Sequence, residues 1–252
     1  LHSDTHSFPT RRSSDLRVAL AEQIGETTDK GLVAREVTRV VTPGTVVEPT
    51  LLDEKRANYL AAALVDQDGR HAGLAYAEIT TGEFATTEFD GDAAAIALEQ
   101  ELSRLAPREC LIPEMPDWKE TDDQENNIVP EFSKHLGNVT QIHWTPWPAW
   151  RFEPARARQT LLDHFQSSTL AAFGCQGKPM AVRAAGAVLS YLQETHKGAL
   201  AQVTSLSTYS TSRFMILDPA TRRNLELSEA ITGTHHGSLL SIIDATQTAM
   251  GA

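Results

Sequence analysis

The sequence predicts a mixed α/β fold, in which a mixed sheet is flanked by helices. Three apolar runs between residues 60 and 89 are separated by the turn pairs Asp68-Gly69 and Thr81-Gly82, a pattern typical of an antiparallel meander. Further along the chain, apolar residues recur at helical spacing in several segments. Strands followed by helices in this order favour a layered fold with one sheet and several helices.

The first elements in chain order are two strands, at residues 17–23 and 33–41. Both segments alternate apolar and polar residues, which is the period of half-buried strands. The stretch between them, residues 25–31, contains Gly, Thr and Asp, which are turn residues. We therefore expect two paired strands joined by a turn.

The meander and the elements that follow it occupy residues 60–112. Its strands are predicted at residues 60–65, 72–79 and 82–89. A helix should then cover residues 92–104, with Asp92 as its N-cap and its apolar positions at Ile96, Leu98, Leu102 and Leu105. A short strand at residues 109–112 follows. Residues 113–130 are rich in Pro, Asp, Glu and Asn and should form an exposed excursion.

The second half of the chain is predicted to be mainly helical. A strand at residues 139–143 leads into a Trp- and Pro-rich corner at 144–150 and a helix at 153–165. The next helix, at 180–196, has one apolar face made of Val182, Ala185, Val188, Leu189 and Leu192.

After residue 206 the composition becomes polar. Residues 207–212 are predicted to form a linker. Asp218 as N-cap and Pro219 at the first helical position then predict a short helix, and residues 239–251 predict another.

Composition limits the class of protein. With 252 residues, of which 41% are apolar, the chain can bury a core. It contains no run of roughly 18 apolar residues of the kind that crosses a bilayer. Cys110 and Cys175 lack a CxxC spacing and fit a reduced cytosol, as buried hydrophobes. The net charge of −11 opposes phosphate binding, so this segment is not expected to be a main DNA-gripping surface.

Two motifs resemble those of bacterial mismatch repair proteins of the MutS family. The first is VVTPGTV at residues 40–46 followed by LLDEKRANYLAA at 51–62, which resembles the start of the family's connector domain. The second is LDPATRRNLEL at 217–227, which resembles the passage from connector into helical core. The resemblance covers residues 17–252.

The resemblance implies a domain organisation. Residues 17–57 would be a remnant of the mismatch-recognition domain and a linker, poorly anchored because its partner strands are missing. Residues 58–208 would be an RNase H-like connector domain. Residues 209–252 would be the truncated start of the helical core or lever domain. Residues 1–16 resemble a translated sequencing adapter and are expected to be an artefact, although a disordered leader or a targeting peptide are alternatives.

The resemblance also implies a function and partners. The intact protein would bind mismatched double-stranded DNA, use ATP and Mg²⁺, form a homodimer and act in the bacterial cytoplasm, without a membrane. The family's nucleotide site and mismatch-reading motif lie outside this sequence. The segment itself is therefore expected to be non-catalytic, to hold no cofactor or metal, to transmit allosteric signals and to dock MutL.

Candidate partner contacts lie on the helix predicted at residues 153–165. The helical period turns Leu161, Leu162 and Phe165 toward the core and leaves Arg158 and Gln159 in solvent. Since the resemblance implies that the connector recruits MutL, Arg158 and Gln159 are the candidate docking residues. The alternative is an ordinary solvated helix face.

Two other functions remain open from the sequence. A stand-alone RNase H-like nuclease would need carboxylates that converge on two metals about 4 Å apart. The nearest candidates are Asp66, Asp68 and Glu78, although a turn and a strand end already explain them. The other alternative is a free-standing protein-interaction module.

The Trp- and Pro-rich corner is a possible site for such a module. Trp144, Trp147 and Trp150 are either a partner-binding patch or part of the core. Packing is favoured, because Trp150 and Phe152 precede a helix start and can fold back onto its first turns.

Overall fold

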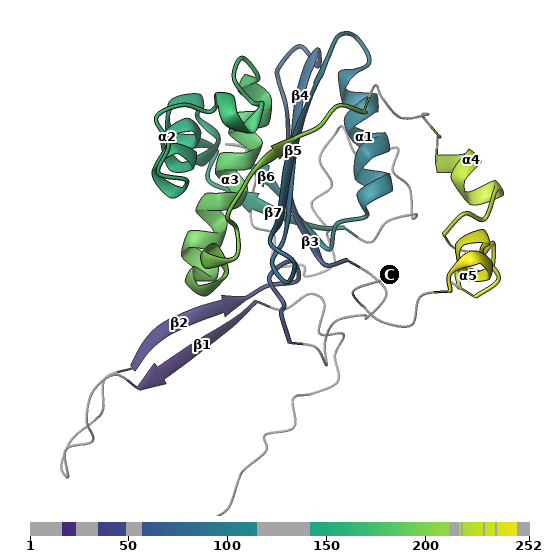
Figure 1. Ribbon diagram of the computed structural model, residues 1–252, viewed down its shortest axis with the longest axis horizontal. Helices are drawn as coiled ribbons and strands as arrows, with labels where there is room; N and C mark the ends of the chain where they lie inside the picture. The colour runs from purple at the N-terminus through teal and green to yellow at the C-terminus, as the bar shows by residue number, and fades with distance from the viewer. Residues whose placement is uncertain are drawn as a thin grey trace, which may run out of the picture.

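The computed structural model describes residues 17–23, 35–48, 57–114, 142–211, 217, 219–228, 230–234 and 236–245. Within these residues the strands form two sheets, a two-stranded ribbon and a six-stranded sheet (Figure 1). Helices lie on both faces of the larger sheet, so the predicted mixed α/β fold is confirmed.

The larger sheet is mixed, with antiparallel pairs at its centre and parallel pairs toward its edges. Its strand order is β7-β6-β3-β4-β5-β8. The strands are β3 (Tyr59–Val65), β4 (His71–Glu78), β5 (Glu83–Asp90), β6 (Glu109–Pro113), β7 (His143–Trp147) and β8 (Ser207–Thr208). Strands β3, β4 and β5 pair antiparallel, which confirms the meander. Strands β6, β7 and β8 join through parallel pairs, β6 to β3, β7 to β6 and β8 to β5.

Helices cover both faces of this sheet, and each face has its own core. Helix α1 (Ala94–Leu105) packs on the face that carries Ala61 and Ala63. Helices α2 (Pro154–His164) and α3 (Pro179–Thr195) cover the opposite face, which carries Leu60 and Leu64 (Figure 1). Because both faces are buried, the central strands are apolar almost throughout instead of alternating.

Helix α3 is buried on nearly all sides, rather than along the single predicted face. It packs between the sheet and α2, and small residues allow both neighbours to come close. A Cβ added to Gly186 would lie 2.5 Å from both Cα and Cβ of Ala157 on α2. A Cβ added to Gly73 of β4 would lie 2.2 Å from the carbonyl oxygen of Met180. Backbone therefore approaches backbone on both sides of this helix.

The two-stranded ribbon consists of β1 (Val18–Gln23) and β2 (Arg35–Val41), paired antiparallel as predicted. It extends away from the larger sheet (Figure 1). Leu20 and Val37 on this ribbon are exposed. The expectation of poor anchoring is wrong at the end of β2. Residues 42–45 are buried and contact the larger sheet.

The predicted start and inner face of α1 need correction. The N-cap position is Ala93, without a side-chain hydrogen bond, while Asp92 forms an ion pair with Arg70 at 2.8 Å. Ile96 is 56% exposed, because it lies two residues from both Ala94 and Leu98, which face the sheet. Leu98, Leu102 and Leu105 are buried as predicted.

The predicted strand at residues 139–143 is displaced along the chain. The observed strand, β7, begins at His143 and includes most of the predicted Trp- and Pro-rich corner. Pro146 is tolerated because β7 is an edge strand, where one side of the backbone needs no strand partner. Residues 139–141 and most of the predicted excursion lie outside the described residues.

Short elements complete the chain. The 3₁₀ helices are η3 (Ala149–Phe152), η4 (Ala171–Phe173) and η5 (Lys197–Ala201). The predicted linker contains strand β8, which adds to the edge of the sheet beside β5. Helix α4 (Pro219–Asn224) starts where predicted, although Asp218 lies outside the described residues. Helix α5 (Leu239–Ile243) is capped by Ser238 and is shorter than predicted.

The two cysteines are buried, as expected for apolar residues of the core. Cys110 and Cys175 are free and buried, and burial raises the pKa of both thiols. Among the described residues, no helix combines the length and apolar character that crossing a membrane requires.

Replacing Gly186 by Ala tests the close packing of α2 against α3. A Gly-to-Ala change in a helix normally stabilises by about 1 kcal/mol. Here the new methyl group would overlap Ala157, so we expect a loss of about 1–3 kcal/mol in the free energy of unfolding, measured by urea titration. Gly198→Ala is the control, because its Cβ would meet His196 only at 3.5 Å. A stabilised Gly186→Ala variant would contradict this packing.

Candidate functional site

The carboxylate of Glu109 is fully buried and accepts four hydrogen bonds from the described residues. Glu109 is the first residue of β6 and its exposed fraction is 0%. Burying a carboxylate is strongly unfavourable unless hydrogen bonds replace its water. The groups around Glu109 are therefore expected to be donors.

Four donors surround Glu109, and they divide between its two oxygens. Oε2 accepts hydrogen bonds from the Thr42 hydroxyl at 2.5 Å and the Gly44 amide at 2.9 Å. Oε1 accepts from the hydroxyls of Thr145 on β7 and Tyr191 on α3, each at 2.7 Å. Four bonds fill the acceptor capacity of a carboxylate. Oε2 thus binds the turn after β2, whereas Oε1 binds strand β7 and helix α3.

Tyr191 is a donor because its hydroxyl stays protonated. Burial and the neighbouring charge of Glu109 raise the pKa of Tyr191 well above its usual value. Its ring also meets Trp147 edge to face, with ring centroids 4.8 Å apart. Tyr191 therefore joins Glu109 to the aromatic side chains of β7.

The turn that reaches Glu109 is shaped by its own sequence. Thr45 donates its amide to the Thr42 carbonyl at 3.0 Å, and its hydroxyl accepts from the Thr42 amide at 2.9 Å. Gly44 is required by space, since an added Cβ would lie 2.8 Å from Cβ of Glu109 and 3.0 Å from Cδ1 of Leu60. The Thr-Pro-Gly-Thr sequence thus places two donors on one carboxylate oxygen.

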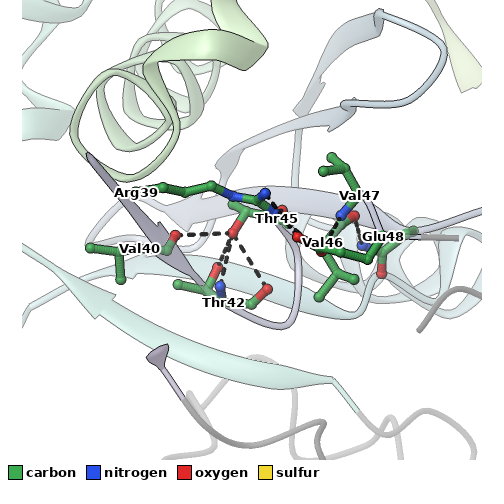
Figure 2. A network of polar contacts seen from close by, with 8 residues as sticks. Arg39, Val40, Thr42, Thr45, Val46, Val47 and Glu48 are labelled. Atoms are coloured by element: carbon green, nitrogen blue, oxygen red, sulfur yellow. Dashed lines mark hydrogen bonds and ion pairs between the residues drawn. The ribbon is translucent and has the colours of Figure 1, made fainter. Parts of the chain in front are cut away.

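An ion pair also holds this turn, from the β2 side. Figure 2 shows Arg39 directed past Thr45 toward Glu48. Arg39 donates to both carboxylate oxygens of Glu48, at 2.9 and 3.3 Å, and to the Thr45 carbonyl at 3.2 Å. Burial raises the pKa of Glu48, but bonds from backbone amides and from Arg39 outweigh it, so the pKa lies below its usual value. The pair ties the end of β2 to the chain beyond the turn.

The segment that leaves the sheet is held by a second buried carboxylate. Tyr209 follows β8, and its hydroxyl donates to Glu101 of α1 at 2.8 Å. Arg104 donates to both oxygens of Glu101, at 2.6 and 3.0 Å. Burial and the charge of Glu101 raise the pKa of Tyr209 above its usual value. Hydrogen bonds to Glu109 therefore hold the chain where it enters the α/β unit, and the bond from Tyr209 to Glu101 holds it where it leaves.

The structure does not bring Asp66, Asp68 and Glu78 together. Asp66 and Asp68 lie at the β3–β4 turn, where they accept from the amides of His71 and Arg70, each at 3.0 Å. Glu78 lies at the opposite end of β4, paired in register with Tyr59. In the described part of the chain, no three His, Cys, Asp or Glu side chains gather closely enough to hold a metal ion.

Arg158 and Gln159 lie on the exposed side of α2, where the helical period predicted them. Gln159 donates to Asp163 of the same helix at 2.6 Å. Within the described residues, Arg158 has no hydrogen-bond or ion-pair partner. Both side chains are accessible, but neither contacts Glu109 or its donors.

In a comparison with known proteins, the two segments that meet at Glu109 match two different family models. The family model described as MutS domain II matches residues 58–205, and that of MutS domain I matches residues 12–50. The chain belongs to the MutS family. Thr42 and Gly44 therefore lie in the part that matches domain I, whereas Glu109, Thr145 and Tyr191 lie in the part that matches domain II.

Curated relatives agree with this assignment. The chain is 37% identical to the DNA mismatch repair protein MutS of Chloroflexus aurantiacus, over 94% of this chain and 29% of that protein. It is 42% identical to the protein of the same name from Thermosynechococcus vestitus, over 93% of this chain and 26% of the relative. It is 41% identical to the MutS protein of Dehalococcoides mccartyi, over 93% of this chain and 25% of that protein. The chain spans about a quarter of the length of these MutS relatives.

The Glu109 cluster of this MutS chain was not found from the sequence. Its donors are separated from Glu109 by 36 to 82 residues, so no local spacing marks them. The available signal was the Thr-Pro-Gly-Thr run, which lies in the part that matches MutS domain I. A glutamate that opens the otherwise apolar strand β6 was the second signal.

Replacing Glu109 tests whether this carboxylate holds the MutS domain I segment. In Glu109→Leu, the Gly44 amide and three hydroxyls lose their acceptor, and an unpaired buried donor costs about 1–3 kcal/mol. We expect a loss of at least about 3 kcal/mol in the free energy of unfolding and faster hydrogen exchange at the Gly44 amide. Glu109→Gln keeps one carbonyl oxygen for Gly44 and should lose less.

Glu101→Gln is the matched control, since it changes another buried carboxylate. It should leave exchange at Gly44 unchanged while weakening the attachment of Tyr209. Equal exchange at Gly44 in Glu109→Leu and the unmodified chain would show that Glu109 does not hold the turn.

Proposed function

We propose that this chain is the connector part of a bacterial MutS mismatch repair protein and passes conformational state between the neighbouring domains. In this proposal residues 17–57 close the mismatch-recognition domain, residues 58–208 are the connector, and residues 209–252 begin the helical core. The whole protein would act in the cytoplasm as a homodimer that binds mismatched DNA and ATP with Mg²⁺. The segment itself would catalyse no reaction.

The observation that carries this proposal is the division of Glu109 between two segments. The turn after β2 contacts one carboxylate oxygen, and β7 and α3 contact the other. A displacement of the β1–β2 ribbon therefore acts on a strand and a helix of the connector through one rigid side chain. Coupling between distant sites requires such a physically continuous element that both sites can bias.

The far end of the connector has a comparable attachment. Tyr209 donates its amide to Thr86 at 3.1 Å, accepts from the Thr87 hydroxyl at 2.9 Å, and donates its own hydroxyl to Glu101. The segment that leads toward α4 is thereby fixed to β5 and α1. Both attachments are built from buried polar groups, whose bonds depend strongly on distance and angle. This supports a mechanical role in which small shifts at one end are transmitted to the other.

The exposed side of α2 supports a role in docking MutL. Arg158 is exposed and has no partner within the described residues, so its guanidinium group is available to a carboxylate or carbonyl of another protein. Gln159 lies beside it with one internal hydrogen bond. We propose these two residues as part of the MutL contact.

The docking proposal predicts that MutL binds the 252-residue chain through α2. The double variant Arg158→Glu with Gln159→Ala should lower the affinity for MutL by at least about tenfold, because an interface arginine and its neighbour are removed and a repulsive charge is added. Biolayer interferometry with purified MutL gives the affinity. Arg70→Glu is the control, since Arg70 is an exposed arginine at the β3–β4 turn that pairs with Asp92, just before α1.

Two results would contradict the proposal. The first is an equal affinity of MutL for the double variant and the unmodified chain. The second is hydrolysis of nucleic acid by the chain with Mg²⁺ or Mn²⁺ that disappears in Asp66→Asn, which would establish a nuclease.

The proposal that the connector transmits conformational state predicts that binding of MutL changes the turn that contacts Oε2 of Glu109. Binding of MutL should change hydrogen exchange at residues 42–45, measured by mass spectrometry, because α3 and this turn share one carboxylate. Glu109→Gln should reduce that change while MutL still binds. An unchanged exchange rate in the MutL-bound chain would refute transmission and leave docking intact.

A further inference from the structure

Trp150 is an exposed aromatic side chain held between two arginines. It lies in η3, before α2, and 41% of its surface is exposed. The Cζ atoms of Arg151 and Arg156 each lie 4.1 Å from the centroid of its ring. Both guanidinium groups therefore lie over the same indole ring. Phe152 is buried as predicted. Trp150 packs against Arg156 in the first turn of α2, as predicted for a residue before a helix start, but it is not part of the core.

The two arginines differ in how their charge is balanced. Arg151 is largely covered, forms an ion pair with Glu194 and also lies 5.7 Å from the centroid of Trp147. Burial and the charge of Arg156 both lower its pKa. Arg156 is exposed, and its guanidinium group pairs with no carboxylate of the described residues. Arg156 therefore carries a positive charge that no carboxylate of the described residues neutralises.

The surrounding layer is basic although the chain is acidic. Residues 142–196, which include α2 and α3, contain five Lys and Arg but only three Asp and Glu, in a chain of net charge −11. The acidic residues therefore concentrate in the rest of the chain. A positive layer on a negative molecule attracts and orients an acidic partner.

We propose that Trp150, Arg151 and Arg156 form a docking surface for an acidic peptide segment of a partner protein. A guanidinium group stacked flat on an indole ring keeps its N–H edge free for bidentate bonds to a carboxylate. The exposed edge of Trp150 offers apolar contact to a neighbouring side chain of that segment. Aromatic residues and arginines of this kind dominate the energetics of many protein interfaces.

The geometry favours an acidic peptide over nucleic acid. Single-stranded nucleic acid binds to aromatic side chains by stacking its bases on the ring face. Two guanidinium groups already lie over the Trp150 ring, so they compete with a base for its faces. The acidic remainder of the chain also repels an extended phosphate backbone.

This surface is independent of the docking of MutL through Arg158 and Gln159. Arg156 and Arg158 are two residues apart on α2, which places them about 200° apart around the helix axis. Arg156 faces Trp150, whereas the positive charge of Arg158 acts on Cys175 at the other side. Failure of either surface therefore leaves the other to be judged by its own measurement.

A labelled octapeptide of alternating Glu and Leu tests the proposal with the full 252-residue chain. Fluorescence anisotropy should show saturable binding that weakens with salt. Arg156→Gln should lower the affinity by at least about fivefold, because a charge-assisted bidentate bond is lost. Arg156→Lys should restore it only in part, since a lysine keeps the charge but not the planar fork. Arg70→Gln, which removes an exposed arginine elsewhere, should leave the affinity unchanged.

The comparison probes are the same peptide with Lys in place of Glu and an oligothymidine of equal charge. The lysine peptide should not bind, and the oligothymidine should bind more weakly than the acidic peptide. Equal binding of the acidic peptide to Arg156→Gln and the unmodified chain would overturn the proposal. Tighter binding of the oligothymidine that depends on Trp150 would overturn it in favour of a nucleic-acid surface.

Discussion

The burial of one carboxylate constrains the arrangement of this MutS segment. Glu109 is inaccessible to water and has four donors from three places in the chain: the turn after β2, strand β7 and helix α3. Its burial fixes the turn after β2, the register of β7 and the rotation of α3 about its axis, because each must present a donor. The absence of a side chain at Gly44 follows from the same constraint. A polar group thus determines the geometry of a mainly apolar unit.

The apolar core makes this precision possible. Alanines occupy the centre of β3 and recur along β4, and α3 presents alanines and Gly186 to its neighbours. Short side chains let the helices approach the sheet closely, so that Tyr191 reaches Glu109 and the start of α3 lies on β4. Close packing also limits the freedom of the helices to shift independently. The polar attachments through Glu109 and Glu101 hold the segments that enter and leave this closely packed unit.

Local features of the fold were predictable from sequence, and long-range ones were not. The meander follows from Asp68-Gly69 and Thr81-Gly82, turn pairs in which the glycines have positive φ angles of 73° and 76°. Strand β8 is only two residues long and depends on pairing with β5, so its polar sequence resembled a linker. Asp92 has the chemistry of an N-cap, but its ion pair with Arg70 takes that side chain away from the helix.

The candidate sites divide in the same way. The helical period correctly placed Arg158 and Gln159 on the exposed side of α2, because exposure on a helix is a local property. The Glu109 cluster and the stacking of Arg156 on Trp150 depend on tertiary contacts. A sequence window around Trp150 could not distinguish a ring covered by core residues from one covered by two arginines.

The sequence separation of the Glu109 donors also bears on how the chain folds. Thr42 and Gly44 precede Glu109 by 67 and 65 residues, and Tyr191 follows it by 82. Contacts between such distant residues form slowly, because closing the long loop between them costs conformational entropy before the contacts can stabilise the fold. During synthesis the turn after β2 leaves the ribosome long before α3 exists. The full set of four hydrogen bonds to Glu109 is therefore completed only after α3 has formed.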